Sequence, residues 1–152
     1  MSTGENWTND SMNKRDLTTK LSTVTTELLR ERGYISFDDL FMKLGYLDPG
    51  DYEAWRHKRI PYLEKVIKVN LGRINFIMKH VRKTSRLGNL KESWTDYRSW
   101  GKGRKIQLRF SKTGDRNIEK AFATRFLMME KKEKKRAFLK KNQEHRKRED
   151  GA

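Results

Sequence analysis

Residues 61–90 read PYLEKVIKVNLGRINFIMKHVRKTSRLGNL, and residues 92–112 read ESWTDYRSWGKGRKIQLRFSK. The first stretch has an apolar stripe at helical spacing, flanked by Val66 and Ile77. The stripe consists of Leu63, Ile67, Leu71, Ile74, Met78 and Val81. The opposite side consists of Lys65, Lys68, Lys79, Arg82, Lys83 and Arg86. The pattern predicts a helix over 61–87 with one buried and one cationic face, and Asn70 and Gly72 leave open a break into two helices.

The second stretch alternates as strands do on both sides of a glycine-rich turn at Gly101-Lys102-Gly103. The alternating positions are Trp94, Asp96 and Arg98 against Thr95, Tyr97 and Ser99, then Ile106, Leu108 and Phe110 against Gln107, Arg109 and Ser111. This predicts a basic β-hairpin near 94–111. The first half also fits a short helix, because its three aromatic residues recur every third position.

The remaining periodic segments predict helices near 15–32, 36–44 and 50–58, and a terminal helix from 116. Ser36 and Asp115 stand where N-caps are expected. The terminal helix would bury Ile118, Phe122, Phe126 and Met129. The expected fold is mainly α (α+β): a compact, winged-helix-like helical domain with one hairpin over residues 13–130. Residues 1–12 are polar and expected to be disordered, and 131–152 are expected to form a basic tail or helical extension.

Positive charge is concentrated in the second half of this domain. The 152 residues have a formal net charge of +16. Residues 1–72 hold 11 basic and 11 acidic side chains, whereas 73–116 hold 13 basic and 3 acidic ones. No acidic residue occurs between Arg73 and Lys91, and such a helix face repels itself unless anions neutralise it. We therefore expect the second half to bind a polyanion and the first half to act as a scaffold.

The expected phosphate contacts fall into two sets. On the helix they are Arg73, Lys79, Arg82, Lys83 and Arg86; on the hairpin, or wing, they are Arg98, Lys102, Arg104, Lys105 and Arg109. Aromatic residues interleave with the second set and could stack on unpaired bases. A place in the core is the favoured interpretation of Trp94, Trp100 and Phe110, because so short a domain has few large apolar groups.

The sequence offers little support for catalysis. His57, His80 and His145 lack metal-ligand spacing, and no cysteine, P-loop or dinucleotide motif is present. The less favoured alternative is a metal-dependent nuclease built from Asp38, Asp39, Asp51, Glu53 and Glu64. We expect no enzyme, no cofactor and no metal. No apolar run reaches membrane-spanning length and no signal peptide begins the chain, so we expect a cytoplasmic protein without a membrane partner.

Several motifs between Tyr34 and Phe126 resemble those of small bacterial proteins for which no activity is established. They are SFDDLFMKLGYL, DYEAWRHKRIPYLEKVI, NLGRIN, SWTDY, WGKG and LRFSKTGD, within about 93 of the 152 residues. The resemblance implies a bacterial source and assigns no role. Its most distinctive residues fit either a structural cluster or a recognition surface: Tyr52, Trp55, Arg56, Arg59, Pro61, Tyr62 and Glu64.

The sequence thus predicts a non-catalytic nucleic-acid-binding protein. It leaves DNA and RNA undecided, and also the oligomeric state. The alternative is an accessory factor of the ribosome or of a protein complex, in which the basic tail would grip structured RNA and the neutral half would dock a protein.

Overall fold

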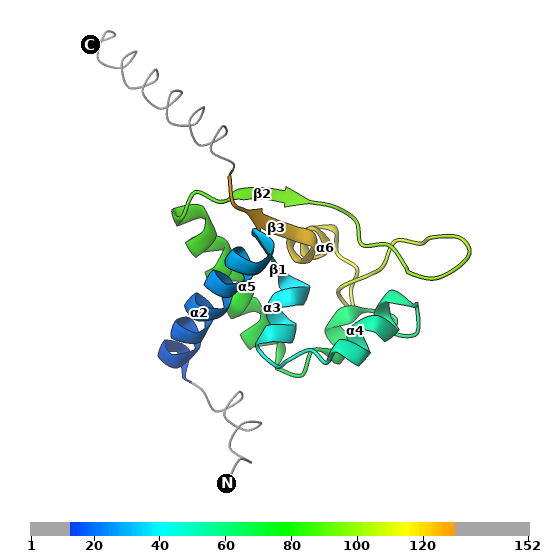
Figure 1. The fold of residues 1–152 in the computed structure, drawn as a ribbon. Helices are drawn as coiled ribbons and strands as arrows, with labels where there is room; N and C mark the ends of the chain where they lie inside the picture. Colours follow the sequence, from blue (N-terminus) through cyan, green and yellow to red (C-terminus); the bar gives the residue numbers. More distant parts are fainter. Residues whose placement is uncertain (1–12, 130–152) are drawn as a thin grey trace.

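The computed structural model describes residues 13–129, which form an α+β domain (Figure 1). Within this range the chain has five α-helices, one 3-10 helix and a three-stranded antiparallel sheet. The helices are α2 (Lys14–Arg32), α3 (Phe37–Lys43), α4 (Pro49–Arg56), η1 (Leu63–Val66), α5 (Leu71–Leu87) and α6 (Arg116–Ala123). The strands are β1 (Tyr34–Ser36), β2 (Lys91–Trp94) and β3 (Thr124–Leu127). No helix in this range is both long and apolar enough to span a membrane.

The predictions of helices near 15–32, 36–44 and 50–58 are confirmed by α2, α3 and α4. Asn13 caps α2 by accepting a hydrogen bond from the Asp16 amide at 2.8 Å. Ser36 precedes α3 as expected, but its hydroxyl donates to the Asp39 carboxylate at 2.7 Å, and its side chain makes no capping bond to the helix backbone. Asp48 caps α4 through the amide of Gly50. Local periodicity therefore accounts for α2, α3 and α4, and side-chain caps fix the starts of α2 and α4.

The prediction of one continuous helix over 61–87 is wrong, and the alternative of two elements is confirmed. The first amides of η1 donate to the carbonyls of Arg109 and Phe110, and the Lys68 amide donates to Tyr46. These tertiary bonds hold the chain out of an α-helical path. Helix α5 then begins at Leu71, after its N-cap Asn70, whose side chain accepts a hydrogen bond from the Arg73 amide at 2.8 Å.

The sheet has the order β1-β3-β2, with β3 antiparallel to both neighbours. The predicted terminal helix is too long. Asp115 caps α6 as expected, but the helix ends at Ala123 and the chain continues as β3. Phe126 is fully buried from this strand and packs edge-on against Phe37, with ring centroids 6.0 Å apart. Ile118, which was expected on the buried face of the terminal helix, is exposed.

The predicted hairpin over 94–111 is present only as a loose pairing. Arg98 and Gln107 form an isolated bridge, flanked by hydrogen bonds from Ser99 to Ile106 and from Leu108 to Tyr97. Continuous strands are absent here, so the expected extent of the hairpin is wrong. Regular pairing occurs earlier, where β2 runs along β3.

A cluster on α4 fixes this loose segment to the helical part of the domain. The buried Trp55 indole donates to the Arg109 carbonyl at 2.8 Å. The Arg56 guanidinium lies over the rings of Tyr97 and Trp100, 4.6 and 4.8 Å from their centroids, and donates to the Arg98 carbonyl. Of the two interpretations that the sequence allowed for this cluster, these contacts support the structural one.

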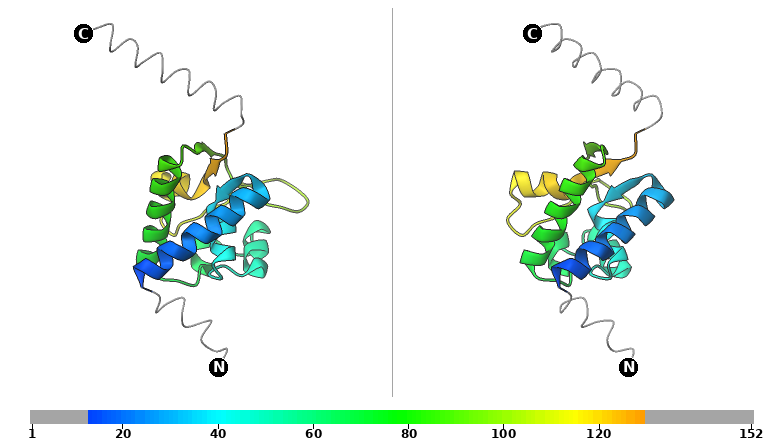
Figure 2. Two further views of the ribbon diagram at one scale, coloured as in Figure 1. Left: turned by 60° about the vertical axis from the view of Figure 1, so that its left-hand side comes forward. Right: turned by 90° about the vertical axis from the view of Figure 1, so that its left-hand side faces the viewer.

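The core lies where α2, α3, α4 and α5 meet the sheet. Its centre is fully buried and includes Leu40, Phe41, Trp55, Ile77, Val81 and Phe126. Figure 2 shows α2 and α5 crossing beside each other, with the far face of α5 turned outward. This packing leaves one long face of α5 for solvent or a ligand.

Candidate nucleic-acid interface

Helix α5 has the two faces that its sequence predicts. Ile74, Ile77, Met78 and Val81 are buried, whereas the cations on the opposite side are exposed. Leu71, expected in the stripe, is the exception and is exposed because α5 begins there. The exposed cations on the outer face are Lys79, Lys83 and Arg86.

The five cations expected as helix contacts have different environments. Lys79 and Lys83 form no ion pair with any residue of 13–129. Arg86 lies 3.1 Å from the carboxylate of Glu92 on β2. Arg73 is partly buried, and its NH1 nitrogen is inaccessible to solvent. Arg82 is partly exposed beside α6. The two lysines are therefore the exposed members of this set that lack an acidic partner among residues 13–129.

A cationic groove of about 500 Å³ runs between α5, β2 and α6. Its cations are Arg82, Arg86 and Lys120, and Glu92 is its one acidic lining residue. The lining consists of Arg82, Arg86, Glu92, Ser93, Trp94, Asn117, Lys120, Ala121 and Thr124. Sequence reasoning missed Lys120 and Asn117. Only the fold brings α6 beside α5, and no local pattern marks these two residues.

Trp94 lies at the edge of this groove and is not a core residue. Its side chain is 52% exposed, and the Lys120 ammonium nitrogen lies 5.7 Å from its ring centroid. The favoured interpretation of Trp94 as core is therefore wrong. Trp100 is 43% exposed and lies against Arg56, so its assignment to the core is wrong as well. Phe110 is buried and stacks on Phe122 of α6.

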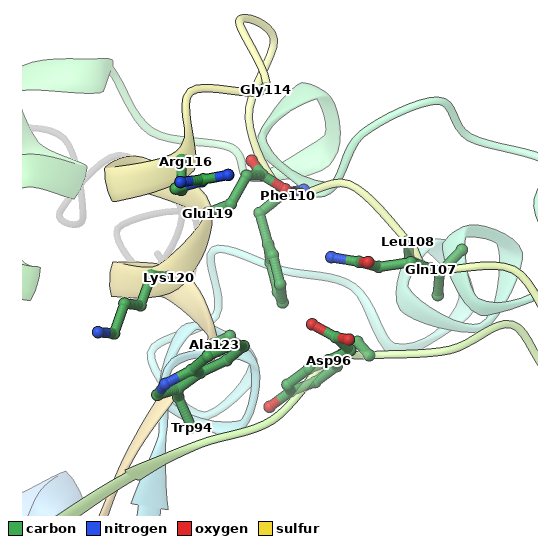
Figure 3. Close-up of a pocket in the computed structure, with 11 residues that line it drawn as sticks. Trp94, Asp96, Gln107, Leu108, Phe110, Gly114, Arg116, Glu119, Lys120 and Ala123 are labelled. Atoms are coloured by element: carbon green, nitrogen blue, oxygen red, sulfur yellow. Dashed lines mark hydrogen bonds between the residues drawn. The ribbon is translucent and has the colours of Figure 1, made fainter.

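A second concavity, the aromatic hollow, lies on the other side of Trp94 and measures about 580 Å³. Figure 3 shows Arg116, Glu119 and Lys120 along α6, Trp94 and Asp96 on the neighbouring strand segment, and Phe110 projecting between Glu119 and Asp96. The remaining lining residues are Tyr97, Gln107, Leu108, Gly114 and Ala123. Tyr97, Leu108, Phe110 and Ala123 are buried and form an apolar floor. The rim is polar.

Glu119 of this hollow has a structural task. Its two carboxylate oxygens accept hydrogen bonds from the amides of Phe110 and Ser111 at 2.8 Å each, and from the Ser111 hydroxyl at 2.6 Å. Asp96 lies 3.8 Å from the Arg98 guanidinium. The carboxylates of the hollow thus have partners already, and the hollow has no excess of positive charge.

The cations expected on the wing do not join the α5 face. Lys102 and Arg104 are exposed on a loop that projects on the right of Figure 1, whereas α5 lies on the left. Gly101 and Gly103 have φ of 100° and 93°, so the turn itself accounts for both glycines. The Lys105 ammonium donates to the Gly101 carbonyl. The exposed cations among the ten expected contacts are therefore divided between two separate surfaces.

Arg109 also has an internal role. Its guanidinium donates to the carbonyls of Ser111 and Lys112, at 2.9 Å in both cases, and lies over the Tyr62 ring. It therefore stabilises the turn that leads to α6. These bonds use two of its five N–H donors, and the others remain on an exposed side chain.

Three of the five carboxylates considered for a nuclease site, Asp38, Asp39 and Asp51, have separate partners. The Tyr97 hydroxyl donates to Asp38 at 2.9 Å, and burial raises the pKa of that tyrosine. Asp39 lies 3.6 Å from Arg32; burial, and then the neighbouring Asp38, raise its pKa. Asp51 lies 4.0 Å from Lys68. Among residues 13–129, no three His, Cys, Asp or Glu side chains gather as a metal site requires.

No protein-family model, curated protein or solved structure matches this chain.

Proposed function

We propose that the protein binds nucleic acid without catalysis, and that the outer face of α5 contacts phosphates. The observation that supports this most is the exposure of Lys79 and Lys83 on one helix face, with no carboxylate partner among residues 13–129. The whole stretch from Arg73 to Lys91 lacks an acidic residue. Phosphates relieve the repulsion within such a face, and the release of their counterions favours binding.

The order of elements supports a winged-helix-like arrangement. In such domains a helix-turn-helix precedes an antiparallel strand pair, and the second helix of the motif enters the major groove of DNA. Here α3 and α5 would be the two helices, and β2 and β3 the strand pair that follows. Two long segments depart from the compact form of this fold: 44–70 in place of the tight turn, and 95–123 in place of a short wing.

Duplex DNA is the form of nucleic acid that the α5 face fits best. The major groove of B-form DNA admits an α-helix, whereas that of A-form RNA is too narrow for side chains to read. An exposed, cationic α5 beside a cationic groove suits the major groove of duplex DNA. Sequence preference would depend on side chains other than the lysines, because phosphate contacts do not distinguish bases.

The test is a titration of labelled duplex DNA and duplex RNA, followed by fluorescence anisotropy at several salt concentrations. We expect the affinity for DNA to fall by about tenfold or more between low and physiological salt. Lys79→Glu with Lys83→Glu should weaken binding and reduce the salt slope. Both side chains are exposed, so the double variant should melt like the wild type.

The matched control is Arg30→Glu with Arg59→Glu, which makes the same change in net charge at two exposed cations outside α5. It should weaken binding much less. Equal losses in the two double variants would mean that only net charge matters, and the α5 face would not be the site. Co-sedimentation with ribosomal subunits, insensitive to mutation of α5, would support the ribosomal alternative instead.

A further inference from the structure

Two concavities of different chemistry meet at one exposed tryptophan. The cationic groove and the aromatic hollow share two lining residues, Trp94 and Lys120. The groove has three cations against Glu92, so it suits an anion. The hollow has two cations, Arg116 and Lys120, against the same number of carboxylates, and its floor is apolar. It suits a neutral, flat group with polar edges.

An unpaired nucleotide combines the two groups that the groove and the hollow suit, an anion next to a flat ring. Its phosphate is an anion, and its base is a flat ring with hydrogen-bonding edges. Gln107, exposed at the rim of the hollow, offers a donor and an acceptor, and Asp96 offers acceptors. Trp94 between the two concavities offers an aromatic face, on which any base can stack.

We propose that the protein binds nucleic acid where nucleotides are unpaired, with a base stacked on Trp94 in the aromatic hollow and adjoining phosphates in the cationic groove. This inference rests on the proposed function. It adds the substrate class: a duplex with a single-stranded end or an extruded base. Bases inside an intact duplex are stacked on one another, so they do not present a face to an indole.

The fold does not require the Trp94 side chain for packing. About half of that side chain is exposed, and the residue joins the sheet through its backbone opposite Thr124. Such an exposed indole among cations is typical of surfaces that bind single strands. Replacement of the side chain should therefore leave the domain folded.

The experiment compares three DNA probes with one common duplex: blunt, with a single-stranded overhang, and with an overhang of abasic nucleotides. The abasic overhang keeps the phosphates and removes the bases. We expect the wild type to bind the normal overhang about tenfold more tightly than the abasic one, the effect of about one stacked base. Trp94→Leu should abolish this difference. Trp94→Phe should keep part of it.

Trp100→Leu is the matched control, since Trp100 is similarly exposed but lies on the loop beside Arg56. It should keep the preference, and melting curves should verify that each variant is folded. If the wild type binds the blunt duplex but shows no preference for the normal overhang, the inference is overturned and the proposed function stands. Retention of the preference in folded Trp94→Leu has the same consequence. If the wild type binds none of the probes, the proposed function itself fails.

Discussion

Lys83 and Arg86 lie about one turn apart on α5 and differ in their partners. Lys83 makes no ion pair within residues 13–129, whereas Arg86 donates two hydrogen bonds to Glu92. Both members of that pair are substantially exposed, and such pairs stabilise a fold by only about 0–1 kcal/mol. A phosphate could therefore take the place of Glu92, although the carboxylate would still repel it. The sequence shows how many cations lie between Arg73 and Lys91, but it does not show which of them have acidic partners.

Glu92→Gln should strengthen the binding of nucleic acid. It removes the one carboxylate of the cationic groove and leaves Arg86 without an acidic partner there. We expect affinity to rise about two- to fivefold at low salt, since the lost interaction is of the order of 1 kcal/mol or less. Glu53→Gln on α4 makes the same change in charge at an exposed side chain away from the groove and should have little effect. Equal gains in both variants would assign the effect to net charge alone.

At the scale of the element, α5 serves the core with one face and the candidate interface with the other. Ile77 is completely buried near the middle of the helix, whereas Leu87 in its last turn is 74% exposed. These two residues differ little in size and apolarity. Their burial alone should therefore decide how much each contributes to the stability of the domain.

Ile77→Ala should lower the free energy of unfolding by about 2–5 kcal/mol, because it removes buried methyl groups and leaves a cavity. Leu87→Ala removes a similar volume from the surface and should cost less than about 0.5 kcal/mol. Urea denaturation followed by circular dichroism measures both. Similar midpoints for the two variants would contradict the assignment of the α5 faces.

Helices could be predicted from the sequence because their signals are local. Periodicity and caps gave α2, α3, α4 and the start of α6 within a few residues. The sheet could not be predicted, since β2 is exposed along its whole length and shows no burial pattern. Phe126 fits the stripe of a longer α6 as well as it fits a strand. Only its pairing with Ile35 and Glu92, both distant in sequence, decides between them.

The candidate site was predicted only in part for the same reason. The cationic face of α5 follows from one local pattern. The groove depends on α6 lying beside α5, and the exposure of Trp94 depends on the strand that holds it. Aromatic residues near the hairpin look alike in sequence, yet Tyr97 and Phe110 are buried while Trp94 and Trp100 are exposed.

At the scale of the whole molecule, the cations of α5 and those of the 101–105 loop lie on different sides (Figures 1 and 2). Charges farther apart than the Debye length of about 10 Å act almost independently at 0.1 M salt. A short nucleic acid bound to α5 should therefore not sense the loop. A longer one could reach both.

Lys102→Glu with Arg104→Glu should have an effect that depends on probe length. With a duplex just long enough for α5, affinity should change by less than about twofold, because the loop charges are screened from it. With a long duplex the loss should grow as the loop gains phosphate contacts. Lys79→Glu with Lys83→Glu makes the same charge change and should weaken binding to both probes. If Lys102→Glu with Arg104→Glu weakens binding to the short probe as much as Lys79→Glu with Lys83→Glu does, the main site lies on the loop.

The central position of β3 also governs when the domain can form as the chain is synthesised. Strands β1 and β2 do not pair with each other, and each finds its hydrogen bonds only on β3, which ends at Leu127. At a synthesis rate of about 5–20 residues per second, roughly 5–20 seconds pass between the addition of Ser36 and the completion of β3, the partner of β1. Until β3 is complete, the edges of β1 are open to other chains, and those of β2 are open from the addition of Trp94 onward. Both strands are short and β2 is largely polar, which limits their pairing with other chains. A chain that stops before residue 124 would contain the residues of all five described α-helices but lack β3, so neither β1 nor β2 would have a strand to pair with.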